Sequence, residues 1–103
     1  MPAEDNQQAL RQQLAQLFEA AADREEIELL INGLLTPSEI EEVAFRWRLI
    51  QALIDGKTQR RISQELSVSL GKISRGSRLL KYGPPRFREL AERLAAEVKE
   101  RAE

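Results

Sequence analysis

Residues 58–81 read TQRRISQELSVSLGKISRGSRLLK, and this stretch predicts two short helices joined by a tight turn. Thr58 and Ser69 each stand directly before a helical pattern, where a hydroxyl side chain can cap the first free backbone N–H groups. We therefore expect one helix at about 59–66 and a second at about 70–80. The Ser-Val-Ser sequence between them forms the turn.

The apolar residues of this stretch are few and regularly spaced. Ile62 and Leu66 lie one turn apart on the first helix. The other candidates for the inner face are Val68 in the turn, Ile73, and Leu79 or Leu80. Such a pattern packs two short helices at a steep angle around a small core. The stretch is therefore a candidate helix-turn-helix, and an ordinary helical hairpin within a bundle is the alternative.

Positive charge is concentrated in and around this stretch. Residues 1–55 carry 4 basic and 11 acidic side chains, whereas residues 56–88 carry 9 basic side chains against Glu65 alone. The whole chain has a net charge of −1. A segregated basic block on a nearly neutral protein is typical of a surface that binds phosphate groups. A solvated basic face would have the same composition.

A helix-turn-helix reads DNA with the first residues of its second helix, which reach base edges in the major groove. Leu70, Gly71 and Lys72 are the base-facing candidates here, with Ser74 next. The start of the first helix offers hydroxyl, amide and guanidinium groups to phosphates. The residues predicted to contact DNA are Thr58, Gln59, Arg60, Ser69, Leu70, Gly71, Lys72, Ser74, Arg78 and Lys81.

Apolar residues recur at helical spacing in the rest of the chain as well. The two terminal stripes are Leu10, Leu14, Leu17, Phe18 and Ala21, and Phe87, Leu90, Leu94 and Val98. Between the first stripe and residue 58 we expect a helix at about 25–32 that stops at Asn32-Gly33. A further helix begins with a capping box of Thr36 and Glu39 and runs to Asp55-Gly56. No stretch alternates with period two, so the prediction is an all-α fold of six helices in a single domain, residues 1–103.

Composition excludes several classes of function. The chain has 103 residues with no cysteine and no histidine, so disulfides, thiolate nucleophiles and the usual zinc sites are excluded. Nothing in the spacing of the other polar residues indicates catalysis, and we expect no enzyme and no cofactor. No apolar run approaches the roughly 20 residues that span a bilayer. The polar, acidic N-terminus is unlike a signal peptide, so we expect a cytoplasmic protein.

Four motifs carry a specific resemblance. Leu35-Thr36-Pro37, Arg46-Trp47-Arg48 and Ile73-Ser74-Arg75-Gly76-Ser77, together with Thr58-Gln59-Arg60, are similar to motifs of the Trp repressor family. The resemblance covers about residues 10–98 and is strongest from about 34 to 81. The resemblance implies an intertwined homodimer that binds double-stranded operator DNA as a repressor when L-tryptophan, its corepressor, is bound.

The resemblance also implies a set of ligand contacts. Arg46 and Arg75 sandwich the indole ring, because guanidinium planes stack on aromatic faces. Arg75 also holds the carboxylate, helped by Thr36 of the partner subunit, and Gly76 leaves room for the indole. The implied ligand-binding residues are Gly33, Leu35, Thr36, Arg46, Leu49, Ile50, Arg75, Gly76 and Leu79. A larger side chain at position 76 is expected to fill the pocket and leave the fold intact.

The chain also departs from the family pattern. The stretch between Gly56 and Arg75 is one residue shorter, and Leu79 replaces a serine that helps to bind the ligand's amino group. Gly71, Lys72 and Arg78 also differ from the usual residues, which leaves the operator sequence open. Two alternatives follow: a similar regulator with a different effector or none, and a helical adaptor whose basic face meets an acidic protein. Binding to duplex DNA separates both kinds of regulator from the adaptor, and binding of L-tryptophan separates the two regulators from each other.

Overall fold

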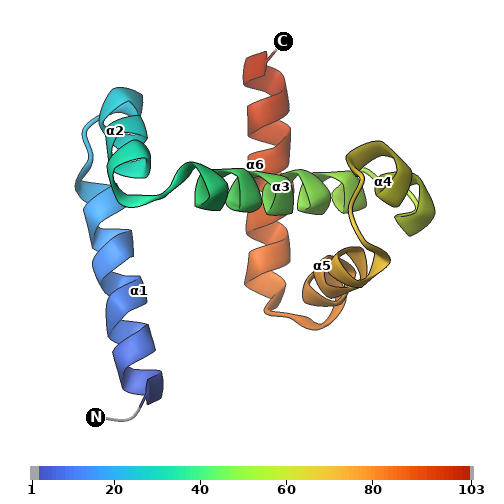
Figure 1. The fold of residues 1–103 in the computed structure, drawn as a ribbon, viewed down its shortest axis with the longest axis horizontal. Coiled ribbons are helices and arrows are strands. Elements are labelled where there is room, and N and C mark those ends of the chain that lie inside the picture. Colours follow the sequence, from blue (N-terminus) through green and yellow to red (C-terminus); the bar gives the residue numbers. More distant parts are fainter. Residues whose placement is uncertain (1–2, 103) are drawn as a thin grey trace. The chain divides into compact units, whose positions relative to one another are not determined.

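The computed structural model describes residues 3–102, and within them the chain forms six helices and no strand (Figure 1). Their bounds are α1 Ala3–Ala20, α2 Arg24–Leu34, α3 Pro37–Ile54, α4 Gln59–Leu66, α5 Leu70–Tyr82 and α6 Pro85–Ala102. The all-α prediction of six helices is confirmed. None of these helices is both long enough and apolar enough to cross a membrane. The chain divides into an N-terminal unit, up to Glu41, and a C-terminal unit, from Glu42 onward.

Side-chain caps mark the starts of α3 and α2. The Glu39 N–H donates to Thr36 Oγ1 at 3.2 Å, and the Thr36 N–H donates to Glu39 Oε1 at 2.9 Å. This reciprocal pair satisfies two otherwise free N–H groups, as the sequence predicts. Asp23 and Glu26 form a similar arrangement at the start of α2, where the Glu26 N–H donates to Asp23 at 3.0 Å.

Two helix ends differ from the sequence prediction. The expected stop of α2 at Asn32-Gly33 is wrong, because the helix continues through Gly33 to Leu34 and ends at the extended residue Leu35. Gly33 has no positive φ, and the true stop lies closer to Pro37, which disfavours helical backbone at the residue before it. Helix α5 likewise runs to Tyr82, two residues further than expected.

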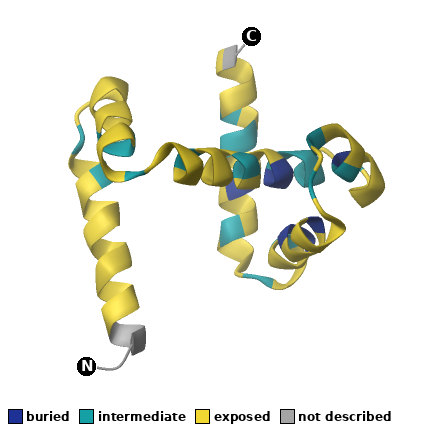
Figure 2. Cartoon of the chain, viewed as in Figure 1, coloured by how far each residue is buried: buried dark blue, intermediate teal, exposed yellow. Residues whose placement is uncertain are grey.

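The N-terminal unit leaves most of its large apolar side chains exposed. Figure 2 shows α1 and α2 almost entirely in the colour of exposed residues, and α2 contains no buried residue. The exposed apolar residues of this unit are Leu10, Leu14, Leu17, Ile27, Leu29 and Leu34. Between α1 and α2 lies a mostly apolar groove of about 340 Å³, lined by Leu17, Ala20, Ala21, Glu26, Leu29 and Leu30. Neither α1 nor α2 has a buried residue among those described.

The C-terminal unit has a small core built on α3, α4 and α5. Ile62 of α4 and Ile73 of α5 are fully buried and cluster with Leu49 of α3. The half-buried residues that pack against this cluster are Ala52, Leu53, Leu66 and Val68. Ile62, Leu66, Val68 and Ile73 are therefore inward-facing, as predicted. The sequence offered Leu79 or Leu80 for the inner face of the second helix; Leu80 is half-buried, whereas Leu79 is 40% exposed.

Helix α3 ends as the sequence predicts. Gly56 takes a left-handed conformation with φ 84°, which glycine adopts without the steric penalty of a β-carbon. The Gly56 N–H donates to the Leu53 carbonyl at 3.1 Å, and the Lys57 N–H reaches back to the Ala52 carbonyl at 3.2 Å. Together the two bonds form a Schellman motif that satisfies the last carbonyls of α3. The chain thus turns sharply into α4 (Figure 1).

Candidate functional site

Helices α4 and α5, with the turn between them, form a tightly connected pair that we call the α4–α5 hairpin (residues 58–82). Thr58 caps α4 by accepting the Arg61 N–H at 3.1 Å, and Ser69 caps α5 by accepting the Lys72 N–H at 3.3 Å. Both caps fall on the predicted residues. Because each cap fixes where its helix begins, the side chains at the start of α5 have a defined register.

The turn is held by two features that sequence reasoning missed. Ser67 ends α4 in the left-handed conformation with φ 53°, unusual for a residue with a β-carbon. The Ser63 hydroxyl donates to the Val68 carbonyl at 2.9 Å, and this contact is partly buried. The bond joins α4 to a turn carbonyl five residues later, beyond the reach of any pattern within one helix. The hydrogen bond ties the three-residue turn to α4.

All ten residues predicted to contact DNA are exposed on this hairpin: Thr58, Gln59, Arg60, Ser69, Leu70, Gly71, Lys72, Ser74, Arg78 and Lys81. Leu70 is an apolar side chain that is 58% exposed at the first position of α5. Ile73, in the same turn of the helix, is fully buried. Helix α5 therefore presents its N-terminal polar face to solvent while it is anchored from behind by Ile73.

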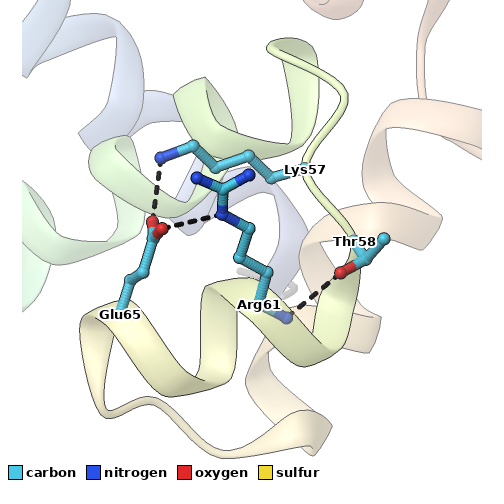
Figure 3. Close-up of polar contacts among 4 residues, drawn as sticks. All are labelled: Lys57, Thr58, Arg61 and Glu65. Carbon is cyan, nitrogen blue, oxygen red and sulfur yellow. Dashed lines mark hydrogen bonds and ion pairs between the residues drawn. The ribbon is translucent and has the colours of Figure 1, made fainter.

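Three of the nine basic residues between 56 and 88 are paired with acids. Lys57 Nζ donates to Glu65 Oε2 at 2.8 Å, and Arg61 Nε donates to Glu65 Oε1 at 2.9 Å (Figure 3). The hydrogen bond from Lys57, followed by that from Arg61, lowers the pKa of the Glu65 carboxyl below its ordinary value. Arg88 pairs with Glu92 on α6 at 2.9 Å. Within residues 3–102, the basic residues of this block without an ion pair are Arg60, Lys72, Arg75, Arg78, Lys81 and Arg86.

Three of the predicted ligand residues come together where α5 meets α3. Gly76 is buried, and a β-carbon on it would lie 3.4 Å from Leu49 Cδ2 and 3.6 Å from Ile50 Cδ1. The same β-carbon would lie 3.3 Å from Leu53 Cδ1, a neighbour that the sequence did not indicate. Glycine at this position thus permits a close approach of the two helices. Leu49 and Ile50 are themselves buried.

The other predicted ligand residues are more exposed. Arg46 is exposed and pairs with Glu42, with Nη2 to Oε1 at 2.7 Å. Arg75 is exposed on α5, one residue before Gly76. Leu79 is 40% exposed one turn later. The remaining three, Gly33, Leu35 and Thr36, belong to the N-terminal unit.

The described part of the chain offers little for metal chemistry. No group of three or more carboxylate, histidine or cysteine side chains in it could hold a metal ion. The guanidinium of Arg48, the second arginine of the Arg-Trp-Arg motif, lies 5.4 Å from the centre of the Phe45 ring. That stacking is a cation–π contact within α3.

Comparison with known proteins places the chain in a family. Residues 9–95 match the family model described as Trp repressor protein. A Trp operon repressor homolog of Vibrio campbellii is 38% identical over 71 residues, covering 68% of this chain and 71% of the relative. One from Vibrio cholerae is 39% identical over 71 residues, covering 68% and 69%. One from Chlamydia trachomatis serovar L2 is 38% identical over 65 residues, covering 62% and 69%. The chain therefore belongs to the Trp repressor protein family.

Proposed function

We propose that this protein is a sequence-specific DNA-binding transcriptional repressor that acts as a homodimer and takes L-tryptophan as its corepressor. The observation that carries the proposal is the exposed face at the start of α5. Leu70, Gly71, Lys72 and Ser74 are all exposed there, on a helix fixed by the Ser69 cap. Side chains at this position of a helix-turn-helix reach base edges in the major groove.

The distribution of unpaired charge supports DNA as the partner. Lys72, Arg75, Arg78 and Lys81 lie along α5, exposed and without an ion pair among the described residues, while Arg60 stands at the start of α4. Cations that are not already paired release condensed counterions when they meet phosphates, and this release dominates protein–DNA affinity. The names of the relatives from Vibrio and Chlamydia, Trp operon repressor homolog, agree with this reading.

The N-terminal unit supports the homodimer. Its apolar residues Leu14, Leu29 and Leu34 are between 52% and 65% exposed, and exposed apolar surface of this kind marks sites of protein–protein interaction when it is contiguous. A helix gains most of its stability from burying its apolar face. A second copy of the chain provides an identical apolar surface, and helix-turn-helix dimers in general bind two half-sites about one DNA turn apart.

The assignment of the ligand rests on Arg46, Arg75 and the Gly76 contact. Two exposed guanidinium groups can stack on an indole, and Arg75 can also hold a carboxylate. The absence of a β-carbon at Gly76 brings α5 close to Leu49 and Ile50 of α3. A ligand between these helices and the DNA-reading face favours one conformation of the hairpin through its differential affinity for that state.

A matched pair of arginine variants tests the proposal. Binding to duplexes selected from a random pool is measured by fluorescence anisotropy with and without saturating L-tryptophan, for the wild type, Arg46→Ala and Arg48→Ala. We expect tryptophan to tighten binding by the wild type and by Arg48→Ala, and to have little effect on Arg46→Ala. Both arginines are exposed on α3, but Arg48 is stacked on Phe45. If the wild type binds no duplex in a salt-dependent way, the DNA-binding proposal is wrong.

A regulator with a different effector is the second candidate, and Leu79 favours it. Its side chain is apolar and 40% exposed one turn beyond Arg75, so it offers no hydrogen bond to an ammonium group. Isothermal titration with L-tryptophan separates the two candidates. If the protein binds the selected duplexes but tryptophan gives no measurable heat, the regulator with a different effector is supported. Saturable binding of tryptophan supports its role as the corepressor.

A further inference from the structure

We propose that Glu65 limits the DNA affinity of the α4–α5 hairpin by holding the side chains of Lys57 and Arg61 against its own carboxylate. Glu65 is thus a positioning residue: it touches no DNA, and it withholds two cations from the phosphate backbone. The inference rests on the proposed DNA-binding function and adds to it a residue that sets the strength of sequence-independent binding.

The geometry of the cluster is specific. One carboxylate oxygen of Glu65 accepts from Lys57 Nζ at 2.8 Å, and the other accepts from Arg61 Nε at 2.9 Å. Figure 3 shows both basic side chains converging on this carboxylate, one from the linker before α4 and one from the first turn of α4. Glu65 therefore uses both oxygens and ties the linker, eight residues away, to the helix.

The position of the cluster makes it relevant to phosphate binding. Lys57 directly precedes the cap residue Thr58, and Arg61 follows Arg60, which makes no ion pair among the described residues. Glu65 is the one acidic residue among positions 56–88, so no other acid of that block competes for these cations. The side chains of Lys57, Arg61 and Glu65 are 35%, 65% and 40% exposed, and so all three are accessible to solvent.

Release of the two cations has a measurable consequence. Each additional phosphate contact changes the slope of log affinity against log salt concentration by about −0.9. A cation that must first leave a carboxylate contributes less than a free one, because the ion pair is lost when the phosphate contact forms. Removing the carboxylate charge of Glu65 therefore makes up to two further contacts available and leaves the base-facing residues of α5 unchanged.

The test compares Glu65→Gln with Glu92→Gln on random-sequence duplex. Glu92 pairs with Arg88 at 2.9 Å in the same i,i+4 arrangement and at similar exposure, so it matches the change in charge. We expect Glu65→Gln to bind roughly three- to tenfold more tightly at low salt, with a salt slope steeper by about one to two. Glu92→Gln should change both quantities much less. Equal effects of the two variants would overturn the proposal.

A second comparison separates release of cations from simple loss of a negative charge. Glu65→Gln is repeated in a chain that also carries Lys57→Gln and Arg61→Gln. The proposal requires the gain in affinity to disappear there, and persistence of the gain would overturn it. If Glu65→Gln does not fold, Glu65→Asp replaces it. This variant keeps the charge but shortens the side chain, so it should show part of the gain in DNA affinity. Circular dichroism checks each variant.

The failures of the two proposals are distinguishable. A wild-type protein that binds no duplex defeats the proposed function, and with it this inference. A wild-type protein that binds DNA in a salt-dependent way, with Glu65→Gln behaving like Glu92→Gln, defeats only the role of Glu65.

Discussion

Gly76 shows how a residue without a side chain can set the distance between two helices. Its missing β-carbon lets α5 approach Leu49, Leu53 and Ile50 closely, since a β-carbon would lie 3.3–3.6 Å from their terminal methyl groups. Helix propensity alone predicts that a larger side chain at position 76 leaves the fold intact. The contacts of position 76 with α3 add a steric term to the unfolding free energy of such a variant.

Substitutions at Gly76 measure that steric term. Gly76→Ala replaces a poor helix former but introduces the tight contact, so we expect a net change in unfolding free energy within about 1 kcal/mol. Gly76→Val adds two more methyl groups and should destabilise the fold by about 1–3 kcal/mol, as overpacking does. Urea unfolding followed by circular dichroism checks both. Equal stability of the valine variant and the wild type would mean that α5 moves away from α3 without loss.

Glu39 links stability to pH at the start of α3. The backbone N–H of Thr36, and then its hydroxyl, hydrogen bond to this carboxylate and lower its pKa below the ordinary value of 4.5. A lowered pKa in the folded state means that the ionised carboxylate contributes stability above pH 4.5, and that this contribution is lost as the pH falls through the folded-state pKa.

The matching experiment compares the wild type with Glu39→Gln. Urea midpoints are measured from about pH 6 to about pH 3. The wild type should lose more stability across this interval than Glu39→Gln, whose amide does not titrate. If stability fell equally with pH in the two proteins, the charge of the Glu39 carboxylate would make no contribution to stability.

At the scale of the element, the α4–α5 hairpin separates anchoring residues from exposed ones. Ile62 and Ile73 are fully buried, and the Ser63 hydroxyl holds the turn through the Val68 carbonyl. Lys72 and Arg60 are both exposed, but they stand at the starts of different helices. Under the proposed function the two residues therefore have different partners on DNA.

Substitution of each residue tests this difference. Lys72→Ala should change which base is preferred at one position, since a good base contact contributes about 1–3 kcal/mol of discrimination. Arg60→Ala should weaken binding to all sequences alike and reduce the salt slope by about 1. Selection followed by sequencing reports the preference, and anisotropy titrations report the slope. A uniform loss of affinity for both variants would remove Lys72 from the base-reading set.

At the scale of the whole molecule, the two units differ in how much core they enclose. The C-terminal unit buries Leu49, Ile62 and Ile73 together, whereas α2 in the N-terminal unit buries no residue. Exposed apolar helices of this kind are stable when another surface covers them. Dimerisation of the N-terminal unit is therefore expected to be obligatory for folding.

Two leucines of similar exposure test the dimer. Leu29 is 65% exposed on α2, and Leu70 is 58% exposed on the hairpin. Sedimentation at micromolar concentration should give about twice the chain mass of 11.8 kDa for the wild type and for Leu70→Glu. Leu29→Glu should shift the protein toward an unfolded or aggregated chain, because it places a charge in the shared apolar surface. A stable folded monomer of the wild type would contradict the prediction.

Local features of this protein were determined by its sequence. The caps at Thr58 and Ser69, the capping box of Thr36 and Glu39, and the turn at Gly56 all fall where the residue pattern predicts them. Each depends on backbone groups within about five residues, so the information lies inside the segment itself. The inward positions of Ile62 and Ile73 follow from the same local periodicity.

Only the tertiary structure decided which residues meet across helices. The approach of Gly76 to Leu53 and the reach of Lys57 from the linker to Glu65 of α4 depend on how separate segments pack. Composition identifies the participants in such contacts, but many packings satisfy the same apolar pattern. The packing of α3, α4 and α5 selects one of them through steric fit, which acts between residues far apart in the chain.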